Sequence, residues 1–185
     1  DACEADYTNP ENRRHHAQTI ACADCGPKLF LLDGEGNEVS GDPIEETAKL
    51  LDEGEILAIR GIGGFHIACV ESAAVKLKQV LGRPNQSLAV MMLEETMKEY
   101  VVAPSDADRE LLTGPVHPIV ILDKLDPTSH PELSQLHNLG VMLPYTALHH
   151  LLFQKLKSPL LVMTSANAPG TPMITDTETI IEKMG

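Results

Sequence analysis

The stretch that decides the fold is EILAIRGIGGFHIAC, residues 55–69, in which an apolar run leads into a glycine-rich turn. The run EILAIR has the length of a buried strand, and Arg60 and His66 stand at the two edges of the turn. The dinucleotide fingerprint G-x-G-x-x-G would require a glycine where His66 stands, so this turn is a different motif. Its glycines allow a backbone to approach a ligand closely, although such a run is also typical of a bulge or a simple turn.

Outward from this stretch, predicted strands and helices alternate along the chain. Near-continuous apolar strands separated by amphipathic helices predict an α/β fold, a sheet covered by helices with at least some parallel pairing. The strands are expected at 29–33, 55–60, 87–92, 118–122 and 160–165. The helices are expected at 42–54, at 71–81, from Ser105, across Leu148 to Leu156 and from Thr175.

Start signals and apolar stripes support these helices. Asp42 caps the first, with Pro43 at the first helical position, and Ser105 with Asp108 forms a capping box. In the same way, Thr175 and Glu178 are expected to cap the last helix. The predicted buried stripes are Ala73, Leu77, Val80 and Leu81 in one helix and Leu148, Leu151, Leu152 and Leu156 in another, with His149 and His150 on a solvated or half-buried face.

Composition limits the class of protein. A chain of 185 residues with 43% hydrophobic content can bury one substantial core. Its 27 acidic and 14 basic residues give a net charge of −13, which argues against binding of nucleic acid or of an anionic membrane surface. With no apolar run near the roughly 20 residues that cross a bilayer, and no signal peptide, we expect a soluble cytoplasmic chain. Cys69, among apolar residues, is expected to be a small core residue.

The three N-terminal cysteines form a candidate zinc site. Cys22 and Cys25 make a C-x2-C knuckle in IACADCGP, and eighteen residues separate Cys3 from Cys22. Such a knuckle aims two sulfurs at one point, which suits tetrahedral Zn²⁺. The fourth ligand would be a cysteine ahead of Asp1, or His15 or His16. The alternative is a pair of reduced thiols in a frayed segment.

A second loop resembles part of a nucleotide site. In MTSANAPG, residues 163–170, Thr164, Ser165 and Asn167 follow an apolar strand, and their side chains can hydrogen-bond a phosphate or a base without adding charge. Ligands of α/β sheets gather outside the carboxyl ends of strands. We therefore expect this loop and the glycine turn to meet across a shared hollow, although T-S-x-N is also ordinary turn chemistry.

Four separated blocks, EILAIRGIGGFHIAC, GRPNQSLAVMM, LGVMLPYTALHHLLF and LVMTSANAPGTPM, resemble in order and spacing the YrdC-like domain of the HypF family, carbamoyltransferases that mature [NiFe] hydrogenases. The segment NPENRRHHAQTIACADCGP resembles the end of that family's second zinc-finger unit. The resemblance implies a twisted mixed sheet covered by helices, with a partial zinc-finger-like segment at 1–28 and a YrdC-like nucleotide-binding domain at 29–185. It also implies a fragment of a larger protein, truncated before the end of that fold.

The resemblance implies a chemistry as well. A YrdC-like domain of this kind joins carbamate, derived from carbamoyl phosphate, to Mg²⁺-bound ATP, and the carbamoyl-adenylate then serves to modify the C-terminal cysteine of the partner HypE. By matched position, His66 faces the carbamate or the α-phosphate, with Arg60 beside it as a catalytic cation. The residues implied in nucleotide and phosphate binding are Arg60, Arg83, Thr146, Thr164, Ser165 and Asn167, and those implied in Zn²⁺ binding are Cys3, Cys22 and Cys25.

One block departs from the family's pattern. Where relatives carry a basic run, VLGRPNQS has Val80, Leu81 and Gln86 in place of three cations, and only Arg83 remains. One charge-assisted hydrogen bond to a phosphate commonly contributes about 1.5–3 kcal/mol to the binding free energy, so the loss of three cations predicts weak ATP binding. Two alternatives therefore stay open: a threonylcarbamoyl-adenylate synthase-like enzyme, and a catalytically degenerate module that binds zinc or nucleotide and serves docking.

Overall fold

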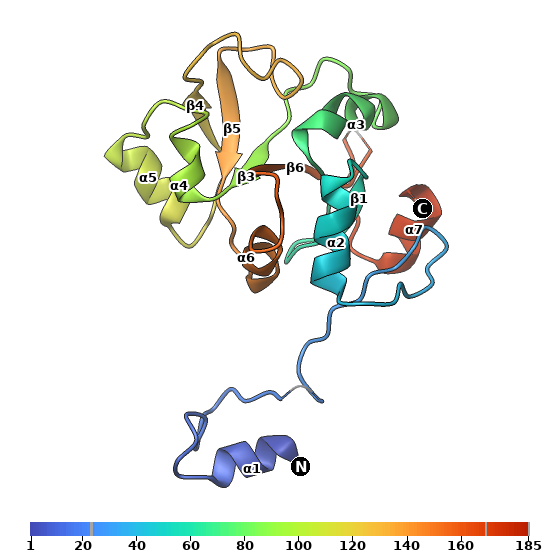
Figure 1. Ribbon diagram of the computed structural model, residues 1–185, viewed down its shortest axis with the longest axis vertical. Helices are drawn as coiled ribbons and strands as arrows, with labels where there is room; N and C mark the ends of the chain where they lie inside the picture. The colour runs from blue at the N-terminus through green and yellow to red at the C-terminus, as the bar shows by residue number, and fades with distance from the viewer. Residues whose placement is uncertain (23, 169, 185) are drawn as a thin grey trace.

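The computed structural model describes residues 1–22, 24–168 and 170–184. Ala23 of the predicted knuckle, Pro169 of the T-S-x-N loop and Gly185 lie outside the described residues. The chain folds around a six-stranded sheet with the order β1-β2-β6-β3-β5-β4 (Figure 1). The strands are β1 (Leu57–Arg60), β2 (Phe65–Cys69), β3 (Val90–Met92), β4 (Val120–Asp123), β5 (Asn138–Met142) and β6 (Leu160–Ser165).

The sheet is mixed, as expected. β3 and β5 pair in parallel, whereas β1 with β2, β2 with β6, β3 with β6, and β4 with β5 pair antiparallel. β2 is hydrogen-bonded on both sides, to β1 and to β6. The glycine turn therefore connects an edge strand to an inner strand of the sheet.

Helices cover both faces of the sheet. Alternate residues of each strand point to opposite faces, so Ile67 packs with Leu77 and Ile180 in one core cluster while Ala68 packs with Leu51 and Leu152 in another. The second face is covered by α2 (Pro43–Asp52) and α6 (Ala147–Phe153). The first face is covered by η1 (Glu71–Ala73), α3 (Ala74–Val80), α4 (Glu94–Met97), α5 (Asp106–Thr113) and α7 (Thr177–Met184).

The N-terminal segment lies apart from the sheet (Figure 1). Its helix α1 (Ala2–Thr8) begins with a capping box between Asp1 and Glu4 and buries none of its residues. Ahead of α2, the chain makes a turn that is closed by the isolated bridge between Leu32 and Glu38. Among the described residues, none of the helices has the length and apolar character needed to span a bilayer.

The predicted strands differ from the structure in three places. Residues 29–33 form no strand, because Phe30 is 61% exposed and only an isolated bridge joins Leu32 to Glu38. Two strands were missed: the prediction placed the residues of β2 in the glycine turn and those of β5 in a polar loop. Short strands such as these give little local periodicity, and only their pairing reveals them.

Details of three helices also differ from the prediction. Val80 is 69% exposed and Leu151 is 44% exposed, because α3 ends at Val80 and α6 presents Leu151 to solvent. His149, expected on a solvated or half-buried face, is buried at 1% exposure. Ahead of α7 the carboxylate of Asp176, and not Thr175, accepts from the backbone N–H of Thr179 over 2.7 Å.

Candidate functional site

The pairing of β2 with β6 brings the two predicted loops together. His66 lies directly opposite Ser165 in the antiparallel register, and Ile67 lies opposite Thr164. Opposite residues of an antiparallel pair share a face, so His66 and Ser165 lie on the face covered by α2 and α6. Thr164 lies on the other face, so only part of the T-S-x-N loop is on the same side as His66.

A chain of hydrogen bonds holds the loop after β6. The Ser165 hydroxyl donates to Asn167 Oδ1 over 2.7 Å, and Asn167 Nδ2 donates to the carbonyl of Thr171 over 2.7 Å. Arg83 Nη2 donates to the backbone carbonyl of Asn167, also over 2.7 Å. Three of the predicted residues, Arg83, Ser165 and Asn167, are therefore joined, and Arg83 uses one of its five N–H donors inside the protein.

Arg60 lies on the opposite face from His66. It pairs with Phe65 in the β1–β2 register, and its guanidinium carbon lies 5.8 Å from the centre of the Phe65 ring. Ile59, its neighbour, is the residue opposite His66. The structure thus does not bring together the predicted catalytic pair of Arg60 and His66. Arg60 instead lines a cavity of about 730 Å³ beside the edge strand β1, between residues 28–34 and α7.

Thr146 caps α6, and the residue before it reaches the site. The Thr146 hydroxyl accepts from the backbone N–H of His149 over 3.2 Å. The hydroxyl of Tyr145 lies 3.1 Å from His66 Nε2. Sequence reasoning missed Tyr145, although its place beside Thr146 in LPYT was a usable signal.

Burial sets the protonation states of His66, Tyr145 and His149. Burial lowers the pKa of His66 and raises the pKa of Tyr145, so both are neutral near pH 7. Burial, helped by the nearby His66 and His150, lowers the pKa of His149 to about 4. His66, Tyr145 and His149 are therefore uncharged near pH 7.

The glycine turn is explained in part by packing. Gly64 has φ +143°, and a side-chain carbon there would lie 2.7 Å from the carbonyl oxygen of Ile174. That carbonyl accepts from the N–H of Phe65 over 2.8 Å. A side-chain carbon at Gly63 would meet no atom within 4 Å. A glycine is thus required at position 64, because the chain ahead of α7 passes close to it. At position 63 there is room for a side chain.

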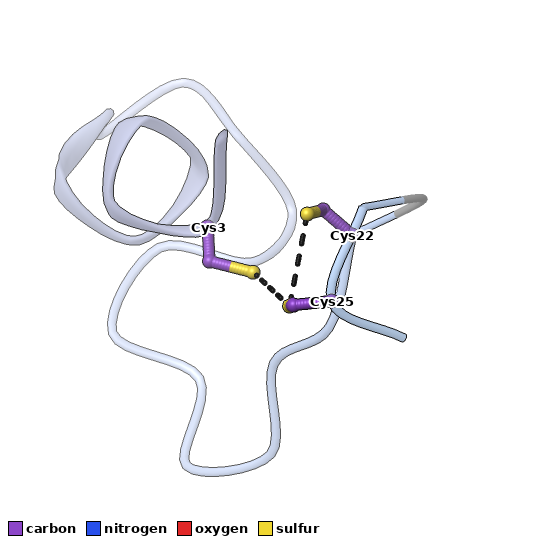
Figure 2. Close-up of side chains that lie close together, drawn as sticks. All are labelled: Cys3, Cys22 and Cys25. Carbon is purple, nitrogen blue, oxygen red and sulfur yellow. Dashed lines mark hydrogen bonds between the residues drawn. The ribbon is translucent and has the colours of Figure 1, made fainter. Parts of the chain in front are cut away.

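Cys3, Cys22 and Cys25 converge as predicted (Figure 2). Their sulfurs lie within 4.8 Å of one another, with Cys22 3.7 Å and Cys3 3.1 Å from Cys25. Tetrahedral zinc with bonds of about 2.3 Å separates two sulfurs by about 3.8 Å, so the group fits three thiolate ligands of Zn²⁺. No histidine or carboxylate of the described residues joins the group, so the suggestion of His15 or His16 as a fourth ligand is not supported.

Local hydrogen bonds prepare one of these thiols for metal binding. Backbone hydrogen bonds, first from Cys25 and then from Asp24, lower the pKa of Cys22 to about 7. Sulfur hydrogen bonds with Cys25 and Cys22 raise the pKa of Cys3 to about 12. Since the thiolate is the form that binds a metal, the lowered pKa favours Cys22 as a ligand.

Comparison with known proteins agrees with this architecture. The Sua5/YciO/YrdC family, described as "Telomere recombination", matches residues 49–185, and the HypF finger matches residues 1–32. The carbamoyltransferase HypF of Rhodobacter capsulatus is 44% identical over 99% of this chain. The chain spans about a quarter of the length of that relative, 25%.

Solved structures show the same fold. A crystal structure of full-length HypF in the phosphate- and nucleotide-bound form is 38% identical, with a TM-score of 0.83 over 100% of this chain and 24% of that one. HypF of T. kodakarensis is 41% identical, with a TM-score of 0.85 over 98% of this chain and 24% of that one. The expected α/β fold and the resemblance to HypF carbamoyltransferases are confirmed. The chain therefore belongs to the Sua5/YciO/YrdC family, and its N-terminal residues match a HypF finger.

Proposed function

We propose that this chain is the part of a HypF-type carbamoyltransferase that binds ATP and carbamate and forms carbamoyl-adenylate. The observation that carries the proposal is the direct pairing of His66 with Ser165, with Arg83 tied to the same loop through Asn167. Three of the sequence blocks that resemble the HypF family thus meet at one end of β2 and β6. The relative in which phosphate and nucleotide are bound supports a nucleotide as the ligand.

The reaction is the transfer of an adenylyl group to an oxygen. A carbamate oxygen attacks the α-phosphorus of ATP, and the bond from that phosphorus to the bridging oxygen breaks, so pyrophosphate leaves with the electron pair. We infer that His66, a neutral imidazole, donates a hydrogen bond to the carbamate or the α-phosphate. Mg²⁺ bound to the nucleotide would neutralise part of the phosphate charge.

The remaining polar residues are proposed to hold the nucleotide. Ser165 and Asn167 lie at the carboxyl end of β6, where the hydroxyl and the amide would contact phosphate or ribose. Arg83 keeps N–H donors beyond the one given to Asn167, and these would bind a phosphate. Thr146 follows Tyr145, whose hydroxyl lies 3.1 Å from His66 Nε2. Arg60 and Thr164 lie on the opposite face of the sheet from His66. They would contact only a part of the ligand that extends past the end of the sheet to that face.

Zinc and the acceptor protein complete the proposal. Cys3, Cys22 and Cys25 would hold Zn²⁺ as thiolates, and the ion would fix the N-terminal segment, which buries little apolar surface of its own. In a protein as long as its relatives, the carbamoyl group would pass to the C-terminal cysteine of HypE. The proposed location is the cytoplasm.

The test is ATP–pyrophosphate exchange that depends on carbamoyl phosphate, measured in a protein that joins this chain to the remaining parts of a HypF relative. Exchange that requires carbamoyl phosphate supports the proposal, and its absence above background contradicts it. Exchange or AMP formation that depends on threonine instead would favour threonylcarbamoyl-adenylate synthesis. Titration of this chain with Mg²⁺ and ATP by calorimetry measures nucleotide binding separately; absent binding together with bound zinc would favour the docking module.

A further inference from the structure

We propose that Tyr145 is a positioning residue that holds His66 in the tautomer with its proton on Nδ1; its importance for the reaction rests on the function proposed above for His66. The two residues lie 79 positions apart in the chain, and Tyr145 Oη lies 3.1 Å from His66 Nε2. None of the sequence patterns predicted this contact.

The backbone of the glycine turn supports the pair. A side-chain carbon added at Gly61 would lie 3.0 Å from His66 Nε2 and 3.2 Å from Tyr145 Oη. The absence of a side chain at Gly61 therefore leaves the space in which the two polar atoms meet. This glycine gives the turn a function that is separate from any contact with a nucleotide.

The charge states of the two groups and their other partners bear on the direction of the hydrogen bond. Tyr145 keeps its proton because burial raises its pKa, and His66 is neutral because burial lowers its pKa. Among the described residues, the Tyr145 hydroxyl makes a hydrogen bond only with His66. If Nε2 carried the proton, the phenol could donate only to solvent, because it makes no other hydrogen bond among the described residues. The proposed arrangement is the one in which the phenol donates to Nε2 and Nδ1 carries the imidazole proton.

Two further histidines enclose the phenol. The ring of His149 meets that of Tyr145 edge to face, with centroids 4.6 Å apart, and the ring of His117 stacks on it at 5.9 Å. Neither ring nitrogen of His149 has a hydrogen-bond partner, and His149 is 1% exposed. The nitrogens of these histidines do not form a group that could share a metal ion within the described ranges. The cluster therefore acts on Tyr145 by packing, which restrains rotation of its ring.

The tautomer matters because the proposed ligands are anions. An Nδ1–H group can donate to a carbamate or phosphate oxygen, whereas an unprotonated Nδ1 would direct its lone pair at the same oxygen. Holding one tautomer before the ligand arrives removes the need for proton exchange during binding. Tyr145 would thus influence the reaction through His66, without touching the ligand.

The test is the tautomeric state of His66 in this chain, read from imidazole ¹⁵N chemical shifts at neutral pH without nucleotide. The wild-type chain should show Nδ1–H, and Tyr145→Phe should populate Nε2–H while keeping the ring contacts with His117 and His149. Tyr100→Phe is the matched control, because Tyr100 also packs against a histidine ring, that of His130 at 5.0 Å. Nε2–H in the wild-type chain, or no change in Tyr145→Phe, overturns the inference.

A second variant and an activity measurement separate this inference from the proposed function. Gly61→Ala should shift the His66 tautomer in the same direction, because the added methyl group pushes the pair apart. In the longer protein, Tyr145→Phe should lower kcat of exchange about 10- to 100-fold with little change in KM for ATP. If the wild-type protein shows no exchange, the proposed function fails while the tautomer result stands. The expected tautomer shift with unchanged kcat overturns the positioning role.

Discussion

The guanidinium of Arg83 donates a hydrogen bond over 2.7 Å to the backbone carbonyl of Asn167, 84 residues further along the chain. This bond joins the block GRPNQS to the loop after β6. Arg83 is half-buried, and this bond holds its guanidinium against the loop that also contains Ser165. The one cation that survives in this block is therefore a structural link as well as a candidate phosphate ligand.

Replacing Arg83 should weaken nucleotide binding. Arg83→Ala removes both the bond to Asn167 and a positive charge, so Kd for Mg²⁺-ATP should rise about 10- to 100-fold by calorimetry. Arg109→Ala is the control, because Arg109 pairs with Glu94 at the surface and its replacement removes the same charge. Equal Kd values for the two variants would contradict a role of Arg83 in the site.

Adding back a lost cation should strengthen binding. Gln86 is exposed three residues after Arg83, so Gln86→Lys introduces a charge without disturbing the core. Kd for Mg²⁺-ATP should fall about 10-fold, as one charge-assisted phosphate contact would give. Gln135→Lys makes the same change in net charge at an exposed position ahead of β5. A similar gain in both variants would show a general charge effect.

Gly64 and Gly63 should differ sharply in their tolerance of a side chain. Gly64→Ala forces an unfavourable φ and a clash with the carbonyl of Ile174, so it should lower the free energy of unfolding by about 1–3 kcal/mol. Gly63→Ala, at an open position, should change it by less than about 0.5 kcal/mol. Urea denaturation measures both, and equal losses would refute the packing explanation of the turn.

His149 should make stability depend on pH. Its pKa of about 4 in the fold lies below the ordinary 6.5, so the unfolded chain binds a proton first as pH falls. The free energy of unfolding should therefore decrease between about pH 6.5 and pH 4, by up to about 3 kcal/mol from this group.

The variant His149→Leu tests that dependence. It removes the titrating ring and its two unpartnered nitrogens, so the part of the pH slope due to His149 should disappear. Stability at pH 7 should rise by about 1–3 kcal/mol. His150→Gln, at an exposed position of the same helix, should keep the slope. An unchanged slope in His149→Leu would show that other groups titrate in this range.

Zinc should bind at the cysteine group. Elemental analysis should find one zinc per chain in the wild type and a loss of zinc in Cys22→Ser, because hydrogen bonds lower the pKa of the Cys22 thiol to about 7. Cys69→Ala should retain zinc, since Cys69 is fully buried in the core beneath α3. Zinc lost from both variants alike would indicate binding outside the group.

The sequence by itself determined the elements whose signals are local. Asp42 accepts from the N–H groups of Ile44 and Glu45, as its capping pattern predicted, and Ser105 forms its capping box with Asp108. The strand predicted at 160–165 is found with those bounds, because a continuous apolar run suits a strand buried on both faces. The cysteine spacing likewise predicted the group that the structure brings together.

Only the tertiary structure decided which residues meet. The register of β2 with β6 sets His66 opposite Ser165, and the alternation of side chains sends Arg60 to the other face. The contact of Tyr145 with His66 depends on where α6 packs against the sheet. Strand pairing and helix docking join residues far apart in the chain, so no local pattern of residue types encodes them, whereas caps and apolar runs act within a few residues.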